Sequence, residues 1–419
     1  MGQIFKAQIL TPKNQKTVLF YDPGYLVVSD EGKIEFVGTK NPRQKYKNYR
    51  FHDHSDLIIC PGFIDTHNHL PQYAFAGIGD FSLLPWLKKY TFPRETQFKS
   101  EKTARPAANN FFTSLLKNGT TTTLTYVTTH FSATNIAFEE AKKAKIRAII
   151  GKVMMDSFSP SALQEKTEKS LQDSLELIEK WHGHDRRLFY ALTPRFALTC
   201  SSKLLEKIAT LAKEKDVYIQ THLSENLEEL KLVKKRFPKA KSYTDVYYRA
   251  GLLTPKTILA HCIHLSNPEL TLIKKAGASI SHCPSSNRFL MSGQMPARKY
   301  LTASTQLSLG TDVAGGYSLS MFNEMREALE TSKSYINPLK PEEVFYMATL
   351  GGAKALSMHK ITGSLEPGKE ADFLIIDPLK FTPDPNTKYQ NPTQILSQMI
   401  YRGSEFAIKN VFIAGKKLN

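Results

Sequence analysis

The sequence predicts an α/β protein, a (β/α)8 TIM-like barrel with a small β-sandwich domain formed by both chain ends. Two observations predict this fold. The middle of the chain alternates short apolar, β-prone runs with helical patterns, which indicates successive βα units and a parallel sheet. Both ends are instead rich in short strand-like segments. The 419 residues, 41% of them hydrophobic, suffice for one large domain and one smaller domain.

The chain ends, residues 1–60 and 365–419, are predicted to form the β domain, which leaves residues 61–364 for the barrel. Turn sequences at 22–24 (Asp-Pro-Gly) and 30–32 (Asp-Glu-Gly) separate strand candidates in the first part. The strand candidates of the two ends are 17–20, 25–28, 33–37, 371–376 and 409–413. We expect these segments to pair into one small sheet domain.

The barrel contains eight strand candidates with helical patterns between them, for example at 171–181, 202–213 and 319–332. The strands end near His67, Tyr126, Met154, Arg195, His222, His261, His282 and Asp312. A (β/α)8 barrel builds its active site at the C-terminal ends of its strands. Six of the eight ends carry a chemically useful side chain, so we expect a site there.

The first of these ends carries His67 and His69. Residues two apart on a strand project to the same face, so the two imidazoles can grip one cation. The His52/His54 and His182/His184 pairs have the same spacing. The first precedes an apolar run and the second lies in a polar segment, so surface or hydrogen-bonded histidines are the better interpretation for both. The spacing alone therefore leaves the metal role open.

Later strand ends strengthen the metal interpretation. His222, His261 and His282 end three successive strand candidates, and Asp312 ends the next. Burying several imidazoles without partners is unfavourable, so convergence on a metal explains them better than independent core packing. His222 followed by Glu225 offers a ligand and a general base, although a structural histidine and a helix-capping glutamate are the alternatives. His282 is more simply a structural hydrogen-bonding residue.

Three histidines and a carboxylate suit zinc, with ferrous iron as the alternative. A bound divalent cation lowers the pKa of water from 15.7 toward about 7, which supplies hydroxide for hydrolysis. The H-x-E with P-C-x-x-C pattern of zinc deaminases that flip bases is missing, and so is the H-E-x-x-H of metalloproteases. The pattern therefore indicates another class of metal-dependent hydrolase.

This arrangement of histidines and an aspartate resembles that of the amidohydrolase superfamily. It resembles the members that hold one metal, because no lysine stands at the end of the fourth strand, where it would bridge two metals. More narrowly, the chain resembles the guanine deaminase family over nearly its whole length. The motifs that carry this resemblance lie at 61–67, 72–77, 84–87, 90–93, 118–122, 151–153, 193–196, 282–287 and 310–316. His264 and Arg288 depart from the family pattern near the expected mouth, which leaves fine substrate preference open.

The resemblance implies a role for each matching residue. His67, His69, His222 and Asp312 would hold one zinc ion per subunit, and His261 would polarise its hydroxide. Glu225 would relay a proton from water to a ring nitrogen, and Asp312 would take the second proton as hydroxide attacks the amino-bearing carbon of guanine. The products would be xanthine and ammonia, as in purine catabolism.

Substrate recognition follows from the same resemblance. Arg195 carries only donors and suits the carbonyl oxygen and acceptor nitrogen of guanine, whereas Gln72 can donate and accept at another edge. Phe196, or alternatively Phe75 or Trp86, could stack on the ring or exclude water, and core packing is the alternative for each of these aromatic residues. His222, Glu225 and Asp312 would also contact the substrate. The alternative substrates are related aminated heterocycles, such as 8-oxoguanine or a triazine. A non-catalytic assembly protein of the same family is the alternative class, although such proteins usually lose ligands.

Composition narrows the remaining classes of function and the cellular location. The net charge of +17 comes from lysines scattered over helical segments without aromatic interleaving, so specific nucleic-acid binding is not expected. The four cysteines are predicted to be buried free thiols. The sequence contains neither a membrane span nor a secretory signal, so we expect a cytoplasmic protein that does not bind membranes. The family resemblance implies a homodimer.

Overall fold

The barrel strands form a parallel sheet that follows the order of the chain. In the computed structural model, which describes residues 1–79, 81–384, 389 and 391–418, the sheet runs β13-β12-β11-β10-β9-β7-β6-β5, and β8 pairs with β9. The strands are β5 (Phe63–His69), β6 (Thr120–Tyr126), β7 (Arg147–Gly151), β8 (Val153–Met154), β9 (Leu188–Pro194), β10 (Tyr218–Leu223), β11 (Thr257–His261), β12 (Ser279–His282) and β13 (Leu307–Leu309). All eight predicted strand positions are confirmed, the third being split into β7 and β8.

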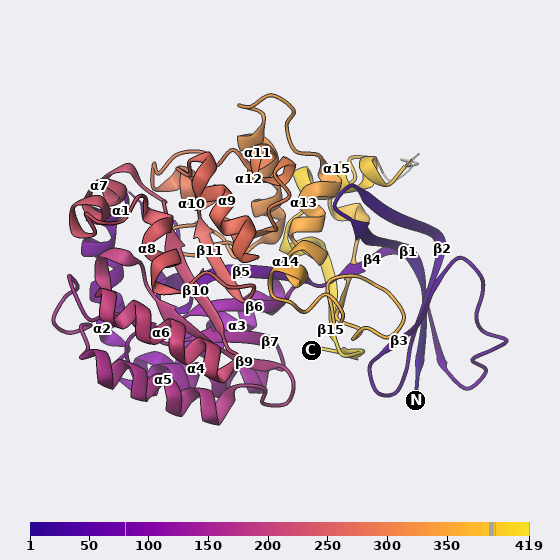
Figure 1. Cartoon of the computed structure of the whole chain (residues 1–419). Coiled ribbons are helices and arrows are strands. Elements are labelled where there is room, and N and C mark those ends of the chain that lie inside the picture. The colour runs from indigo at the N-terminus through magenta and orange to yellow at the C-terminus, as the bar shows by residue number, and fades with distance from the viewer. Residues whose placement is uncertain (80, 385–388, 390, 419) are drawn as a thin grey trace. The chain divides into compact units, whose positions relative to one another are not determined.

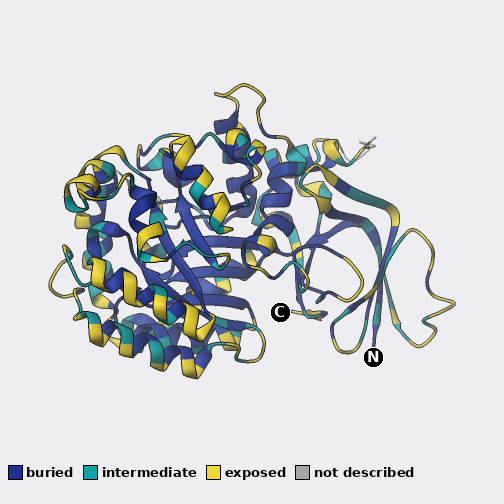
Figure 2. Cartoon of the chain, in the orientation of Figure 1, coloured by how far each residue is buried: buried dark blue, intermediate teal, exposed yellow. Residues whose placement is uncertain are grey.

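Backbone hydrogen bonds bring the two edges of this sheet together. The amide of Asp312 donates to the carbonyl of His67 over 2.8 Å, and the amide of His69 donates to the carbonyl of Val313 over 3.1 Å. The segment after β13 is thereby joined to the end of β5, and the predicted barrel is confirmed. Its strands are buried, whereas the surrounding helices expose their outer faces (Figures 1 and 2). The residues at the strand ends consequently share one mouth.

Helices follow the barrel strands, as the alternating pattern predicts. They are η1 (Leu70–Phe75), α1 (Leu83–Trp86), η2 (Leu87–Thr91), α2 (Phe92–Gln97), α3 (Glu101–Lys117), α4 (Phe131–Ala144), α5 (Thr167–Trp181), η3 (Ala197–Thr199), α6 (Ser202–Lys215), α7 (Leu227–Arg236), α8 (Tyr243–Ala250), α9 (Asn267–Ala276), α10 (Pro284–Phe289) and α11 (Ala297–Thr302). Their ends follow local sequence rules. Ser201 caps α6 with its side chain, and Gly251 and Gly277 end α8 and α9 with positive φ angles.

The two chain ends form one sheet with the order β16-β15-β14-β4-β1-β2-β3, counted over the described residues. Its strands are β1 (Gln3–Asn14), β2 (Thr17–Val28), β3 (Ile34–Gly38), β4 (Arg50–Pro61), β14 (Phe373–Ile376), β15 (Ile408–Ile413) and β16 (Lys416–Lys417). β14 pairs antiparallel with β4, so Leu374 from one end of the chain faces Cys60 from the other. The prediction that both ends build one β-rich part is confirmed, and a single continuous sheet provides it.

One sequence prediction about this sheet is wrong. The Asp-Pro-Gly turn expected at 22–24 lies inside β2, which runs unbroken from Thr17 to Val28. The pairing of β1 with β2 shifts register between Ala7 and Ile9, which face Gly24 and Tyr21. A β-bulge absorbs the extra residues, so the chain keeps its direction where turn-forming residues indicated a reversal.

Contacts within the chain define two compact units, Met1–Ile64 with Leu115–Thr122 and Ser320–Asn419, and Asp65–Ser114 with Thr123–Leu319. The first unit includes the helices α12 (Met321–Ser332), α13 (Pro341–Met347), α14 (Leu350–Ala355), η4 (Pro378–Lys380), α15 (Pro392–Arg402) and η5 (Glu405–Ala407). The predicted domain limits at 60/61 and 364/365 stay a prediction. Within the described residues, no helix combines the length and apolar character needed to cross a membrane.

Candidate active site

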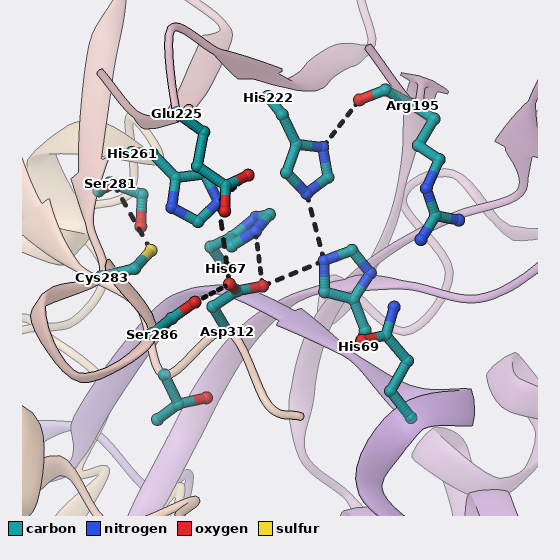
Figure 3. Close-up of polar contacts among 12 residues, drawn as sticks. His67, His69, Arg195, His222, Glu225, His261, Ser281, Cys283, Ser286 and Asp312 are labelled. Atoms are coloured by element: carbon teal, nitrogen blue, oxygen red, sulfur yellow. Dashed lines mark hydrogen bonds and ion pairs between the residues drawn. The ribbon is translucent and has the colours of Figure 1, made fainter. Parts of the chain in front are cut away.

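The end of β5 places His67 and His69 beside a carboxylate from the far edge of the barrel sheet. The Nε2 atoms of both histidines lie 3.1 Å from Oδ1 of Asp312. Both imidazoles are almost fully buried, and Figure 3 shows both of them next to the same carboxylate oxygen of Asp312. The spacing of two on a strand therefore brings this pair to one point, as expected.

Hydrogen bonds on the outer ring nitrogens orient the other two histidines. Nδ1 of His222 lies 2.7 Å from the carbonyl oxygen of Arg195, to which it donates. Nδ1 of His261 lies 2.8 Å from Oδ1 of Asn287 and donates to that oxygen. Each ring thus carries its proton on Nδ1, which leaves the lone pair of Nε2 pointing into the cluster. Such orienting bonds are typical of histidines that bind metals.

The cluster fits a divalent cation. His67, His222, His261 and Asp312 each offer one ligand atom, and these atoms lie within 4.8 Å of one another. Within the described chain, the buried Nε2 atoms of His67 and His261 have no hydrogen-bond partner. His69 lies outside this group of four, although its Nε2 is 3.2 Å from Nε2 of His222. Inward lone pairs without partners are what a bound cation would satisfy.

Burial sets the charge of the cluster. It lowers the pKa of His67 to about 4, lowers the pKa of His69, and lowers the pKa of His222 well below its ordinary value. Burial alone would raise the pKa of Asp312, but His67 and His69 outweigh it and hold that pKa well below the usual range. His67, His69 and His222 are therefore neutral imidazoles and Asp312 is an ionised carboxylate at neutral pH, which are the forms that ligate metals.

The carboxyl group of Glu225 lies next to this cluster. Its Oε2 lies 3.4 Å from Nε2 of His261, and its Oε1 accepts a hydrogen bond from Ser292 over 3.4 Å. Burial, together with the negative charge of Asp312, raises the pKa of Glu225 well above its ordinary value. A carboxyl group with a raised pKa takes up a proton more readily than an ordinary one, which suits it to proton transfer.

The helix-capping alternative for Glu225 does not apply. Asn226 caps α7, and Glu229 completes the capping box by accepting from the backbone amides of Glu225 and Asn226. Since other residues satisfy the helix start, the side chain of Glu225 is available at the pocket.

One pocket joins the cluster to the predicted recognition residues. Polar side chains of the cluster share its wall with apolar and aromatic ones. It is lined by His69, Gln72, Leu83, Trp86, Leu87, Arg195, Phe196, His222, Glu225, Glu229, Leu290, Asp312 and Gly315. A flat heterocycle placed here would contact donors, acceptors and apolar surface together.

Sequence reasoning missed Glu95, a fully buried residue of α2. Its carboxylate accepts two hydrogen bonds from Nη1 of Arg195, at 2.9 and 2.8 Å, and one from Nε2 of Gln72 at 3.3 Å. The helix pattern around Glu95 gives no sign that this acidic side chain points inward. Only its position two residues after the 90–93 motif could have drawn attention to it.

The remaining singled-out residues lie elsewhere. His282 is buried, outside the group of four, and neither of its ring nitrogens has a hydrogen-bond partner in the described chain. His52 stacks on Phe5 in the seven-stranded sheet, and His182 accepts from the amide of Tyr190. The four cysteines are buried and free, as predicted.

The fold and the cluster together define a class of protein, a (β/α)8 barrel with a cluster suited to a metal ion at its strand ends. The sequence pattern of the amidohydrolase family matches residues 58–418. The guanine deaminase of Escherichia coli (strain K12) is 36% identical over 403 residues, which cover 95% of this chain and 91% of that protein. The mouse enzyme of the same name is 38% identical over 94% of this chain and 91% of its own length.

A solved structure agrees with these relatives. The crystal structure of guanine deaminase from C. acetobutylicum, with guanine bound in its active site, superposes with a TM-score of 0.94 at 36% identity and covers all of both chains. The chain therefore belongs to the amidohydrolase family and, within it, to the guanine deaminases. This membership confirms the resemblance predicted from the motifs.

Proposed function

We propose that this protein hydrolyses guanine to xanthine and ammonia at the pocket described above. The observation that carries the proposal is the shared pocket, in which Glu225 and Asp312 lie close to the recognition pair Arg195 and Gln72. Its relatives are named guanine deaminases, and one of them holds guanine in its active site. Water supplies the oxygen of the new carbonyl, and the amino group leaves as ammonia.

We assign one divalent metal per subunit to His67, His69, His222 and Asp312, with zinc as the preferred ion and ferrous iron as the alternative. Nitrogen and carboxylate ligands in this number suit these ions. When bound, such an ion makes water nucleophilic at neutral pH by lowering its pKa. His261 is proposed to orient the attacking water rather than to hold the ion.

The protons are moved by the two carboxylates. Glu225 takes a proton from the water and delivers it to a ring nitrogen beside the amino-bearing carbon, for which its raised pKa is suited. Asp312 accepts the second proton, which then leaves with the amino group. The ionised state of Asp312 before reaction supports this role.

Recognition comes from the other end of the pocket. Arg195 donates to the carbonyl oxygen and the neighbouring ring nitrogen of guanine, and Gln72 contacts a second edge. Phe196 is proposed to stack on the ring, which is supported by its position in the pocket wall and its exposure of only 6%. Adenine would direct an amino group at Arg195, so a site of this kind discriminates strongly against it.

Ammonia release from guanine, 8-oxoguanine, adenine, cytosine and a triazine, with metal analysis of the same preparation, tests the function. We expect turnover of guanine well above that of the other compounds and about one metal per chain. Faster turnover of 8-oxoguanine or the triazine would support the alternative substrates. Metal-replete protein without turnover of any compound would support the assembly-protein alternative.

Metal content of two variants tests the ligand assignment. His69 and His261 are alternative candidates for the same metal-ligand position, because the Nε2 atoms of both lie near the Asp312 carboxylate. We expect His69→Ala to lose the metal and His261→Ala to retain it while losing turnover. The reverse pattern would assign the ion to the group of four that contains His261.

Three further expectations join this proposal. The family resemblance supports a homodimer, which sedimentation or light scattering would test. The domain limits at 60/61 and 364/365 and the cytoplasmic location stay predictions.

A further inference from the structure

We propose that Glu95 is a positioning residue that sets the selectivity of this site, because one carboxylate orients both Arg195 and Gln72. The inference rests on the proposed function. It adds a residue that touches neither the metal cluster nor, in our assignment, the substrate.

The geometry singles out Glu95. It is fully buried in α2, and both of its oxygens accept from the same nitrogen, Nη1 of Arg195. Oε1 also accepts from Nε2 of Gln72. Arg195 and Gln72 line the pocket, whereas Glu95 does not. The Glu95 carboxylate therefore contacts both recognition side chains without lining the pocket itself.

The chemistry of a carboxylate determines how each partner is turned. An ionised carboxylate only accepts hydrogen bonds, so Gln72 must direct its NH2 group at Glu95 and its carbonyl oxygen elsewhere. For Arg195, Nη1 is engaged, while Nε and Nη2 form no hydrogen bond within the described part of the chain. The site is thus left with donors from Arg195, and with the carbonyl oxygen of Gln72 as an acceptor beside the second N–H of its NH2 group.

This arrangement specifies the hydrogen bonds a ligand must offer. Arg195 requires acceptors, which guanine provides at its carbonyl oxygen and the adjacent ring nitrogen. The acceptor of Gln72 requires an N–H, which guanine provides at the ring nitrogen between its carbonyl carbon and its amino-bearing carbon and which 2-aminopurine lacks. Without Glu95, the amide of Gln72 could rotate by 180° and present a donor instead. Selectivity for guanine over purines without the carbonyl would then weaken.

A purely stabilising role explains the contacts less well. Buried ion pairs contribute little net stability, because removing two charges from water offsets most of their attraction. The Arg195 guanidinium also lies 5.3 Å from the centroid of the Phe92 ring, so packing already supports it. The carboxylate is better explained by the direction it imposes on the two donors.

The experiment compares guanine with 2-aminopurine, which keeps the amino group and lacks the carbonyl oxygen. Guanine is followed by kcat/KM, and 2-aminopurine by its inhibition constant against guanine, which requires no turnover. The variants are Glu95→Gln, which keeps the shape and loses the charge, and Glu95→Asp, which keeps the charge and retracts it. Glu140→Gln is the matched control, because Glu140 is a buried carboxylate paired with Arg105 outside the pocket.

We expect Glu95→Gln to lower guanine kcat/KM by about 30-fold or more and to change the 2-aminopurine inhibition constant by less than about threefold. Glu95→Asp should fall between this variant and the wild type, and it provides the comparison if Glu95→Gln does not fold. Glu140→Gln should match the wild type in both measurements. An equal loss for both ligands, or no loss, would overturn the inference. Absence of guanine turnover in the wild-type protein would instead refute the proposed function.

Discussion

Replacing Glu225 by glutamine tests the proton transfer most directly. The amide has the shape of the carboxyl group, so the hydrogen bond with Ser292 and the packing of this 2% exposed side chain are kept. It cannot take a proton from water. Glu225 is not among the residues assigned to the metal, and its Oε2 lies 3.4 Å from Nε2 of His261. The variant should therefore lose chemistry and keep its metal.

The size of the effect follows from the role. General acid–base catalysis contributes about 10² to 10⁴ in rate, which corresponds to roughly 3 to 5 kcal/mol of transition-state stabilisation. We expect guanine kcat to fall by at least about 100-fold, with KM changed by less than about threefold. Glu140→Gln is the control for carboxylate loss, because Glu140 is a buried carboxylate outside the pocket whose partner Arg105 is partly exposed.

The assay is xanthine formation at saturating guanine, with metal content measured on the same sample. Near-normal kcat in metal-replete Glu225→Gln would remove Glu225 from the mechanism. Loss of metal together with activity would mean that this carboxyl group supports the ion instead of moving protons. Only the combination of retained metal and lost turnover agrees with the structure.

Three other outcomes are expected. Arg195→Ala should lower guanine kcat/KM by a factor that corresponds to about 2 kcal/mol or more of lost transition-state stabilisation. It should also lower the melting temperature, because Glu95 is left buried and unpaired. Unchanged kcat/KM would mean that other groups bind the carbonyl. Gly62→Ala should destabilise the protein by about 1 to 3 kcal/mol in chemical unfolding, because the added Cβ would overlap the buried Thr121 side chain; unchanged stability would show that this contact relaxes. Prolonged chelation should abolish xanthine formation and added Zn²⁺ should restore it, whereas full activity in metal-free protein would refute a metal mechanism.

The sequence by itself determined the elements and most of the chemistry. Strand length and apolar pattern are local properties, so the order of residues along the chain was enough to place the eight barrel strands. The barrel then brings their ends to one mouth by topology alone. For this reason His67, His222 and Asp312 could be expected to meet although they come from strands far apart in the chain.

Only the tertiary structure decided which of these side chains face one another. Glu95 and Arg195 are 100 residues apart, and no local pattern marks α2 as the element that lies behind the recognition pair. The mutual distances among the ligand atoms likewise placed His261, and not His69, in one group with His67, His222 and Asp312. In β2, pairing with β1 outweighed the turn preference of residues 22–24. Side-chain orientation and strand pairing depend on contacts between distant residues, which a pattern read along the chain does not contain.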